Sequence, residues 1–294
     1  MEKQHTGNGS TVSDVIFIAD FFAGDVTGGA ELHDDVVISH LKASGILHSK
    51  IRSQQVDVEY LSKNKDKRFM IGNFAGLSFE CLVYLASNCK YLLYEHDYKF
   101  VDSRNPIAFP NFVVPKRNII NINFYKNAMK VVCLSGMHRK IFQDNLGFEN
   151  LENINCSMWT DDSLDKILDM LGNEKLDKMA VINSPNRLKK TKEAAEFCKS
   201  RGLEFDLIAS RDYYEFLKML SRYSGLVFMT GHPEPTPRVA IEAKMLDCKF
   251  VSQKNLIGVA HEDYFDLSGA HMVERVREMR DDALVKIKDW LYEV

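Results

Sequence analysis

The chain has 294 residues, which is enough for two domains that each bury their own core. It carries 38 basic and 41 acidic side chains, a formal net charge of −3, and neither half of the sequence is strongly basic. Bulk electrostatic attraction to DNA or RNA is therefore not indicated, and we expect no nucleic acid among its partners.

Positions 1–13 are mainly polar, and no apolar run approaches the roughly 18 residues that a membrane-spanning helix needs. The first 13 residues also lack the apolar segment of a secretory signal, and they are too polar to offset their ordering entropy. We therefore expect a disordered leader at 1–13, no transmembrane segment and a cytoplasmic location. The cysteines have no metal-type spacing and are expected to be reduced, mostly buried thiols: Cys81, Cys89, Cys133, Cys156, Cys198 and Cys248.

Short apolar runs alternate with amphipathic stretches from residue 15 onward, which is typical of β-α units that build a parallel sheet with both faces covered. The first half of the chain predicts strands at 15–19, 69–72, 91–94 and 130–134. Helices are predicted between them at 29–43, 78–86 and 137–145. Residues 14–157 are therefore expected to form a Rossmann-like N-terminal domain.

The second half shows the same alternation without repeating the sequence. It predicts strands at 179–183, 205–208, 225–229 and 249–251, and helices at 189–201, 213–221 and 238–246. The acidic stretch 157–174 is expected to contain the connection, so a second Rossmann-like domain spans 158–273, and apolar residues at helical spacing predict a closing helix within 274–294. The expected fold class is α/β, with two doubly wound domains that face each other across a ligand-binding cleft.

The strongest local motif is Gly-His-Pro-Glu-Pro-Thr-Pro-Arg, which ends at Arg238 and follows a predicted strand. Its three prolines stiffen the loop before a helix begins near Arg238. A helix N-terminus offers free N–H groups and partial positive charge, which suit a diphosphate next to Pro237 and Arg238. Glu234 precedes this helix and Glu242 lies inside it, so the two carboxylates can accept hydrogen bonds from the hydroxyls of a bound sugar and ribose. A solvated helix start is the alternative interpretation of such a pair.

Glu234 and Glu242, with seven residues between them, resemble the paired-glutamate signature of retaining glycosyltransferases of family four and their GT-B relatives. The segment 243–251 is similar to the helix, turn and strand that follow in that family. The chain departs from the usual pattern because no Gly-Phe-Gly follows Glu234 and because Asp247 replaces a glycine. The resemblance covers about residues 15–259 and implies a GT-B fold that transfers a sugar from a UDP- or GDP-sugar, with retention of configuration and without a metal or other cofactor.

A second loop, at 20–31, joins the first predicted strand to the first predicted helix. Gly28 and Gly29 allow a ligand close to the backbone and supply N–H donors at the helix start, although an ordinary turn is the alternative. Gly-Gly-Ala-Glu at this place resembles the family's loop beside the donor diphosphate and sugar. It is not a Gly-x-Gly-x-x-Gly fingerprint, which disfavours NAD as a ligand.

A third loop, at 183–192, runs from a strand end into a helix and contains four cations. These cations can neutralise the charge that grows on the diphosphate as the glycosidic bond breaks, or they can form a solvated helix face. In GT-B relatives an arginine and a lysine five residues later have this role, so the resemblance implies Arg187 and Lys192 as catalytic residues. Lys189 and Lys190 are the alternatives to Lys192.

A fourth group of polar side chains follows the predicted strand at 91–94. His96 and Asp97 resemble the family's N-domain segment in which a histidine contacts the donor sugar, and a satisfied structural histidine is the alternative. Ser135 and His138 follow the strand at 130–134 and are further candidates for lining the cleft.

No acidic or histidine cluster has the spacing of a metal site, so no metal ligands are predicted. An epimerase or phosphorylase with a GT-B fold is the rival enzyme, although no pyridoxal lysine site is recognisable. A catalytically degenerate GT-B domain that binds nucleotide or glycan without turnover is the rival from another class, and slow hydrolysis of a sugar donor would argue against it. The sequence does not identify the acceptor, which can be a glycan, a lipid-linked sugar or another molecule, or the oligomeric state.

Overall fold

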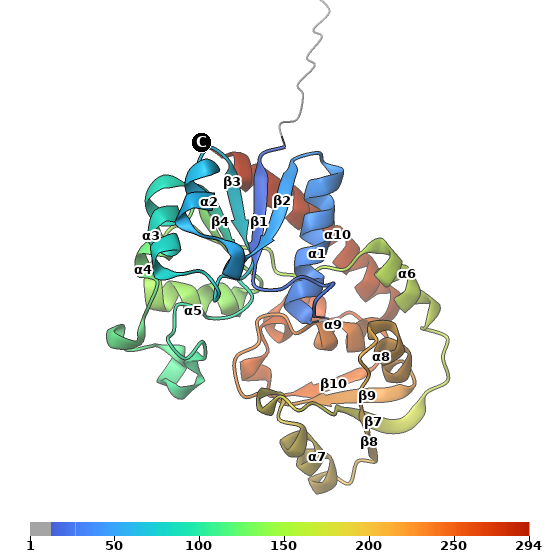
Figure 1. Cartoon of the computed structure of the whole chain (residues 1–294). Coiled ribbons are helices and arrows are strands. Elements are labelled where there is room, and N and C mark those ends of the chain that lie inside the picture. Colours follow the sequence, from blue (N-terminus) through green and yellow to red (C-terminus); the bar gives the residue numbers. More distant parts are fainter. Residues whose placement is uncertain (1–12, 27, 294) are drawn as a thin grey trace, which may run out of the picture.

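Two parallel sheets form the framework of the chain in its computed structural model, which describes residues 13–26 and 28–293 (Figure 1). The first sheet has six strands in the order β2-β1-β3-β4-β5-β6, and the second has four in the order β10-β9-β7-β8. Every neighbouring pair in both sheets is parallel. The predicted α/β fold with two Rossmann-like sheets is confirmed. The predicted leader at 1–13 lies, apart from Ser13, outside the described residues.

The N-terminal sheet is covered by helices on both faces. Its interior strand β1 has no exposed residue, because β2 and β3 flank it and helices pack above and below. The elements of this domain are β1 (Val15–Ala19), α1 (Gly29–Ala43), β2 (Leu47–Arg52), α2 (Val58–Lys63), β3 (Arg68–Ile71), α3 (Phe79–Asn88), β4 (Lys90–Tyr94), α4 (Ile122–Lys126), β5 (Lys130–Cys133), α5 (Gly136–Leu146) and β6 (Leu151–Asn153).

The C-terminal sheet follows a connecting helix, α6 (Asp161–Asp169), which lies within the stretch expected to hold the connection. The helix α9 begins at Arg238, as predicted, and ends before Asp247, whose φ of 56° lies in the left-handed region that favours glycine. The elements are β7 (Leu176–Ile182), α7 (Thr191–Ser200), β8 (Phe205–Ile208), α8 (Tyr213–Leu220), β9 (Tyr223–Phe228), α9 (Arg238–Met245) and β10 (Lys249–Ser252).

Several elements differ from the sequence-based expectation. The strand β2 was not predicted because its partly buried and exposed side chains alternate and the exposed ones are His48, Lys50 and Arg52. The helix α7 begins two residues later than predicted. Lys190, with a φ of 47°, separates α7 from a short 3₁₀ turn at Arg187–Lys189.

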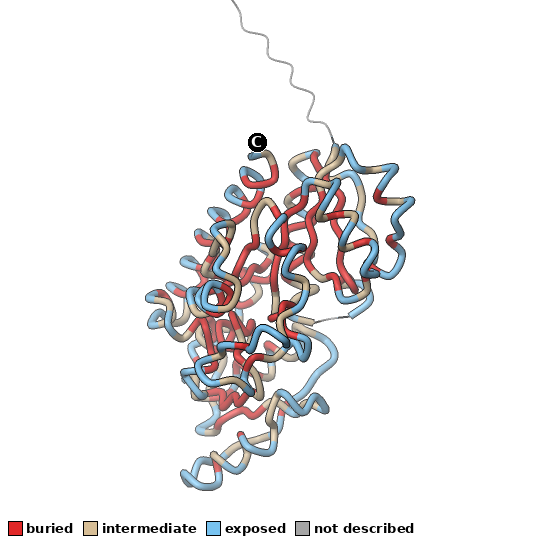
Figure 2. The backbone as a smooth tube through the Cα atoms, turned by 90° about the vertical axis from the view of Figure 1, so that its left-hand side faces the viewer, coloured by how far each residue is buried: buried red, intermediate tan, exposed pale blue. Residues whose placement is uncertain are grey.

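The last helix, α10 (Gly269–Tyr292), begins earlier than the predicted closing helix and joins the two domains. It packs on α6 and α9 and then on α1 and β4 of the N-terminal domain, as its course in Figure 1 shows. At its end, Arg68 Nε donates to the Leu291 carbonyl at 2.7 Å and the Tyr292 hydroxyl donates to Asp14 at 2.6 Å. Buried side chains of both domains and of α10 form one continuous apolar cluster, and the burial along the chain is visible in Figure 2.

This packing predicts the effect of shortening a buried side chain of α10. Ile287 is 1% exposed, so Ile287→Ala should lower the free energy of unfolding by about 2–5 kcal/mol. Val285, on the same helix and 56% exposed, provides the matched control, and Val285→Ala should change stability by less than about 0.5 kcal/mol. Urea denaturation of the two variants would measure both values, and equal losses would contradict the packing described here.

Candidate functional site

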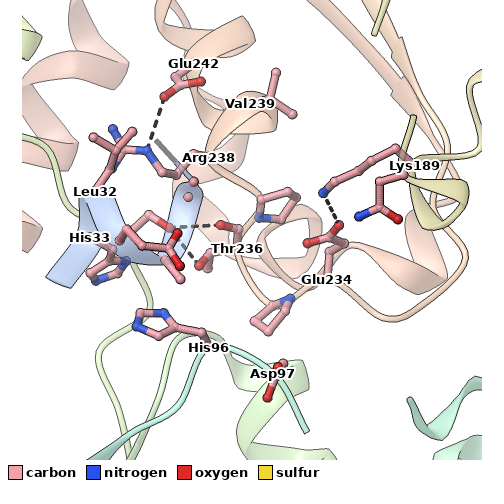
Figure 3. A pocket seen from close by; sticks show the side chains of 18 of the residues that line it. Leu32, His33, His96, Asp97, Lys189, Glu234, Thr236, Arg238, Val239 and Glu242 are labelled. Atoms are coloured by element: carbon pink, nitrogen blue, oxygen red, sulfur yellow. Dashed lines mark hydrogen bonds and ion pairs between the residues drawn. The ribbon is translucent and has the colours of Figure 1, made fainter. Parts of the chain in front are cut away.

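A cavity of about 550 Å³ lies where the carboxyl ends of the two sheets face each other (Figure 3). The N-terminal domain lines it with the start of α1 and with the loop that follows β4. The C-terminal domain lines it with the loops that follow β7, β8 and β9 and with the start of α9. Open parallel sheets bind ligands at this edge, so the topology places a candidate site here.

Two helix N-termini from different domains open into this cavity. The N-cap of α1 is Gly28 and that of α9 is Pro237, and neither forms a side-chain capping hydrogen bond. The first backbone bonds run from Leu32 to Gly28 and from Ala240 to Pro237, so the preceding amides donate to no backbone carbonyl of the helices. Their N–H groups and the helix dipoles favour an anion between the two ends.

Glu234 and Lys189 form an ion pair in the cavity. Lys189 Nζ lies 2.7 Å from Glu234 Oε1, and His232 Nε2 lies 3.3 Å from the same oxygen. Burial raises the pKa of Glu234, but the charges of Lys189 and His232 outweigh this effect, so the pKa falls below its usual range. The carboxylate is therefore ionised at neutral pH and able to accept hydrogen bonds.

The backbone around Glu234 is held by the segment that follows β10. Glu234 N donates to the Leu256 carbonyl, and Gly258 N donates to the Glu234 carbonyl, each at 2.8 Å. A Cβ atom at Gly258 would lie 2.3 Å from the carbonyl oxygen of Pro235, so only glycine allows this close approach. The proline loop is thereby fixed to its own domain.

Glu242 lies at the centre of a buried polar network. Its Oε1 accepts from the Tyr213 hydroxyl at 2.7 Å and from Trp159 Nε1 at 3.1 Å, and Arg238 Nε lies at 3.4 Å. The Arg238 guanidinium lies 4.3 Å from the centre of the Trp159 ring and donates to the Met158 carbonyl. These contacts attach the interdomain connection to α9.

The N-terminal domain contributes a pair formed by His96 and Asp34. His96 Nε2 lies 2.7 Å from Asp34 Oδ1, and a Cβ at Gly72 would approach the Asp34 carboxylate to 2.5 Å, so glycine makes room for it. His33 packs edge-on against His96 and contacts the Tyr94 hydroxyl. Burial, together with the charge of His96, holds the pKa of His33 well below its usual range, so that side chain is neutral at pH 7.

Asp97 lines the cavity within a second ion network. Lys99 Nζ is 3.0 Å from Asp97 Oδ1 and 2.9 Å from Glu95 Oε2, and Arg104 pairs with the other Asp97 oxygen. Burial raises the pKa of Asp97, but the charges of Lys99 and Arg104 more than offset it and lower the pKa to about 2. Asp97 therefore stays ionised at neutral pH.

The structure brings most of the sequence-predicted residues to this cavity. The residues that line it are Gly28, Gly29, His96, Asp97, Lys189, Glu234, Pro237, Arg238 and Glu242. Arg187, Lys190 and Lys192 are not among its lining: Arg187 and Lys192 are exposed, and Lys190 pairs with Glu193 on the outer surface.

The expectation that Ser135 and His138 line the cleft is wrong. Both are fully buried, because Ser135 caps α5 by accepting from the His138 amide and His138 Nδ1 accepts from the Leu134 amide. His138 Nε2 donates to the carbonyl of Asp97 at 3.0 Å, and burial lowers the pKa of His138 to about 3. The pair supports the loop that carries Asp97.

Sequence reasoning missed Arg211, in the loop after β8, and Tyr213, the first residue of α8, which both line the cavity. Their position directly after a predicted strand was the signal that could have found them. The cavity is lined by four Lys and Arg side chains, and three of them pair with a carboxylate of the lining. Arg211 is the fourth, and it forms no ion pair with a described residue.

Among residues 13–26 and 28–293, no group of three or more His, Cys, Asp or Glu side chains is placed to hold a metal ion. Within the same part of the chain, no helix is both long and apolar enough to cross a membrane. All six cysteines are free thiols, and five of them are buried.

No protein-family model matches the chain, and no curated protein matches it. An alpha-glucosyltransferase in complex with UDP and a 13-mer DNA matches 95% of this chain and 95% of its own, with a TM-score of 0.53 and 11% identity. The lipopolysaccharide outer core galactosyltransferase WaaB matches 94% of this chain and 98% of its own, with a TM-score of 0.51 and 8% identity. Anabaena HepE in complex with UDP and glucose matches 95% of this chain and 92% of its own, with a TM-score of 0.47 and 14% identity. The first two matches show that the chain has the fold of GT-B glycosyltransferases.

The ion pair of Glu234 predicts a pH-dependent stability. Because the pKa of Glu234 is depressed in the native state, the stabilisation is present above the usual carboxyl range and is lost as the pH falls through the native pKa. Lys189→Met should therefore cost about 1–3 kcal/mol at pH 7, and this loss should shrink towards pH 3 as Glu234 protonates. Lys190→Met, which breaks only the exposed pair with Glu193, should cost about 0–1 kcal/mol. Denaturation curves at several pH values give both numbers, and a Lys189→Met loss that is independent of pH would refute the role of the ion pair.

Proposed function

We propose that the protein transfers a sugar from a nucleoside diphosphate sugar to an acceptor. The observation that carries the proposal is the convergence of two helix N-termini on one cavity that also holds Lys189, Glu234 and Glu242. Oriented N–H groups and a cation suit a diphosphate, whereas carboxyl oxygens suit the hydroxyls of ribose and sugar. The fold shared with GT-B glycosyltransferases supports the same proposal.

In this proposal the diphosphate lies between Gly28 and Gly29 on one side and Pro237 and Arg238 on the other. Glu242 binds the ribose through Oε2, because its Oε1 already accepts from a tyrosine and a tryptophan. Arg211 contacts the nucleotide from the loop after β8, where its charge has no carboxylate partner among the described residues.

Glu234 and His96 contact the transferred sugar from opposite domains. As the bond between the sugar C1 and the β-phosphate oxygen breaks, the electron pair stays on the phosphate and its charge rises. We assign the stabilisation of this charge to Lys189, which already lies inside the cavity against Glu234. The same role for Arg187 and Lys192, which the family resemblance implies, is the alternative, and it would require the loop at 183–192 to move inward.

Two finer features belong to the same proposal. Retention of configuration is supported by the resemblance of the segment from Glu234 to Glu242 to retaining family-four enzymes. Independence of a metal is supported by Lys189 and Arg211, which supply positive charge where metal-dependent transferases use a cation. UDP- and GDP-sugars are the donors to test, and the acceptor enters beside Asp97 and Arg104.

Ligand binding should be measurable without knowledge of the acceptor. UDP or GDP at 100 times its Kd should stabilise the native state by about 2.7 kcal/mol and raise the Tm. The shift should be the same with EDTA and should be lost for the free nucleoside, which lacks the diphosphate. A Tm shift that EDTA abolishes would refute metal independence. The absence of a shift with any nucleoside diphosphate or its sugar would refute the proposed function.

Turnover should distinguish Lys189 from Arg187. With an active donor, Lys189→Ala should lower the kcat of donor hydrolysis or transfer by a factor on the order of 10 to 1,000, because the interaction is strongest in the transition state. Lys189→Arg should recover part of the rate, and Arg187→Ala should leave kcat near that of the unmodified protein. A large loss of kcat in Arg187→Ala with little loss in Lys189→Ala would transfer the role to Arg187. Donor binding without any turnover would identify a degenerate binding domain.

A further inference from the structure

The charge of the chain is unevenly distributed along the sequence. Between Ser103 and Gln143 there are seven lysine and arginine residues and neither aspartate nor glutamate. The rest of the chain has 31 basic against 41 acidic residues, so this segment is a basic region in an acidic protein. The position and the ion pairs of these basic residues in the structure show which surface they form.

Part of this segment forms an outward extension of the N-terminal domain. It leaves the sheet after β4, passes through short 3₁₀ turns at Pro106–Ala108, Pro110–Phe112 and Lys116–Asn118, and returns into α4. An antiparallel bridge between Val101 and Ile119 closes its base. Figure 1 shows the extension below α4, on the same side of the domain as α3, and this side faces the viewer in Figure 2.

The extension carries exposed aliphatic side chains next to its cations. Ile107, Val113, Ile120 and Ile122 are between 38% and 50% exposed, and they are four of the 15 large apolar residues that are exposed in the described chain. The helix α3 packs on α4 and adds Phe79 and Val83, which are one helical turn apart and are 75% and 48% exposed. Apolar exposure is therefore concentrated on this side of the domain.

Three cations between positions 107 and 126 have no counter-ion in the described chain. Lys116, Arg117 and Lys126 are exposed and form no ion pair with a described residue, whereas Arg104, Lys130 and Lys140 of the same segment pair with carboxylates. Unpaired cations beside exposed aliphatic side chains match the surface of an anionic bilayer, where lysine and arginine meet headgroup phosphates and apolar side chains enter the interface. A nucleic acid would use the cations but would leave the isoleucines and valine in water.

We propose that this surface, which we call the 107–126 surface, docks the protein on an anionic lipid bilayer. Asn105 Nδ2, at the start of the extension, donates to the Gly231 carbonyl of the C-terminal domain at 3.0 Å, and the adjacent Arg104 lines the cavity. The bilayer would therefore lie next to the entrance through which an acceptor reaches the cavity. The docking surface is separate from the residues proposed to transfer sugar, so it can be tested whether or not that function is correct.

Vesicle flotation tests the proposal directly with the full chain. Binding should occur with vesicles that contain phosphatidylglycerol and should be weak with phosphatidylcholine alone. Lys116→Gln with Arg117→Gln should reduce the partition coefficient by about 30-fold, because each cation near an anionic surface contributes about a fivefold factor. Ile120→Ser with Ile122→Ser should also reduce it several-fold, since the interface takes up apolar side chains. Each pair is exposed, and an unchanged Tm would show that the fold is intact.

Matched controls lie on other surfaces of the molecule. Lys199→Gln with Lys218→Gln removes two exposed cations of the C-terminal domain, and Val285→Ser removes an exposed valine of α10, and neither should change vesicle binding. Absence of binding to anionic vesicles, or equal losses in the control variants, would overturn the proposal. Binding to a DNA duplex that depends on Lys116 and Arg117 but not on Ile120 and Ile122, without vesicle binding, would overturn it in favour of a nucleic acid.

Discussion

The central constraint on this molecule is that three carboxylates of its interdomain cavity, those of Glu234, Glu242 and Asp97, each lie beside a cation. Glu234 is held by Lys189, Glu242 by Arg238 and its hydroxyl and indole partners, and Asp97 by Lys99 and Arg104. Removing one partner of a buried ion pair leaves an uncompensated charge and is strongly destabilising, so each cation supports the carboxylate beside it. A diphosphate sugar would offer both kinds of group at once, with phosphate oxygens for the cations and hydroxyls for the carboxylates. We therefore regard ligand binding as an exchange of partners within the cavity.

The sequence was sufficient for the framework of the fold. Continuous apolar runs identify strands such as β1 and β4, because they are buried on both faces of the sheet, whereas the half-exposed β2 reads as polar. The proline loop and the start of α9 at Arg238 also followed from local rules. These rules depend on neighbouring residues and do not need the tertiary structure.

The site was less predictable because it depends on the left-handed backbone of Lys190 and on side chains that are distant in the sequence. The loop motif pointed to Arg187, but the 3₁₀ turn and the left-handed Lys190 place Lys189 in the cavity and Arg187 in solvent. Glu242 meets Trp159 and Tyr213, which lie in other elements. Likewise, the net charge of −3 gave no sign of the basic segment between Ser103 and Gln143. Its cations share one surface with exposed aliphatic side chains only because the extension projects from the N-terminal domain. The net charge of a chain therefore does not show whether its basic residues gather on one surface.

A crystal structure with a bound nucleoside diphosphate sugar tests the partner exchange most directly. The account predicts that the diphosphate lies between the N-termini of α1 and α9, with Lys189 Nζ on a phosphate oxygen and Glu234 on a hydroxyl of the sugar. The distance of 2.7 Å between Lys189 and Glu234 should then lengthen beyond an ion pair. A nucleotide bound elsewhere, or one gripped by Arg187 while Lys189 remains on Glu234, would contradict the account.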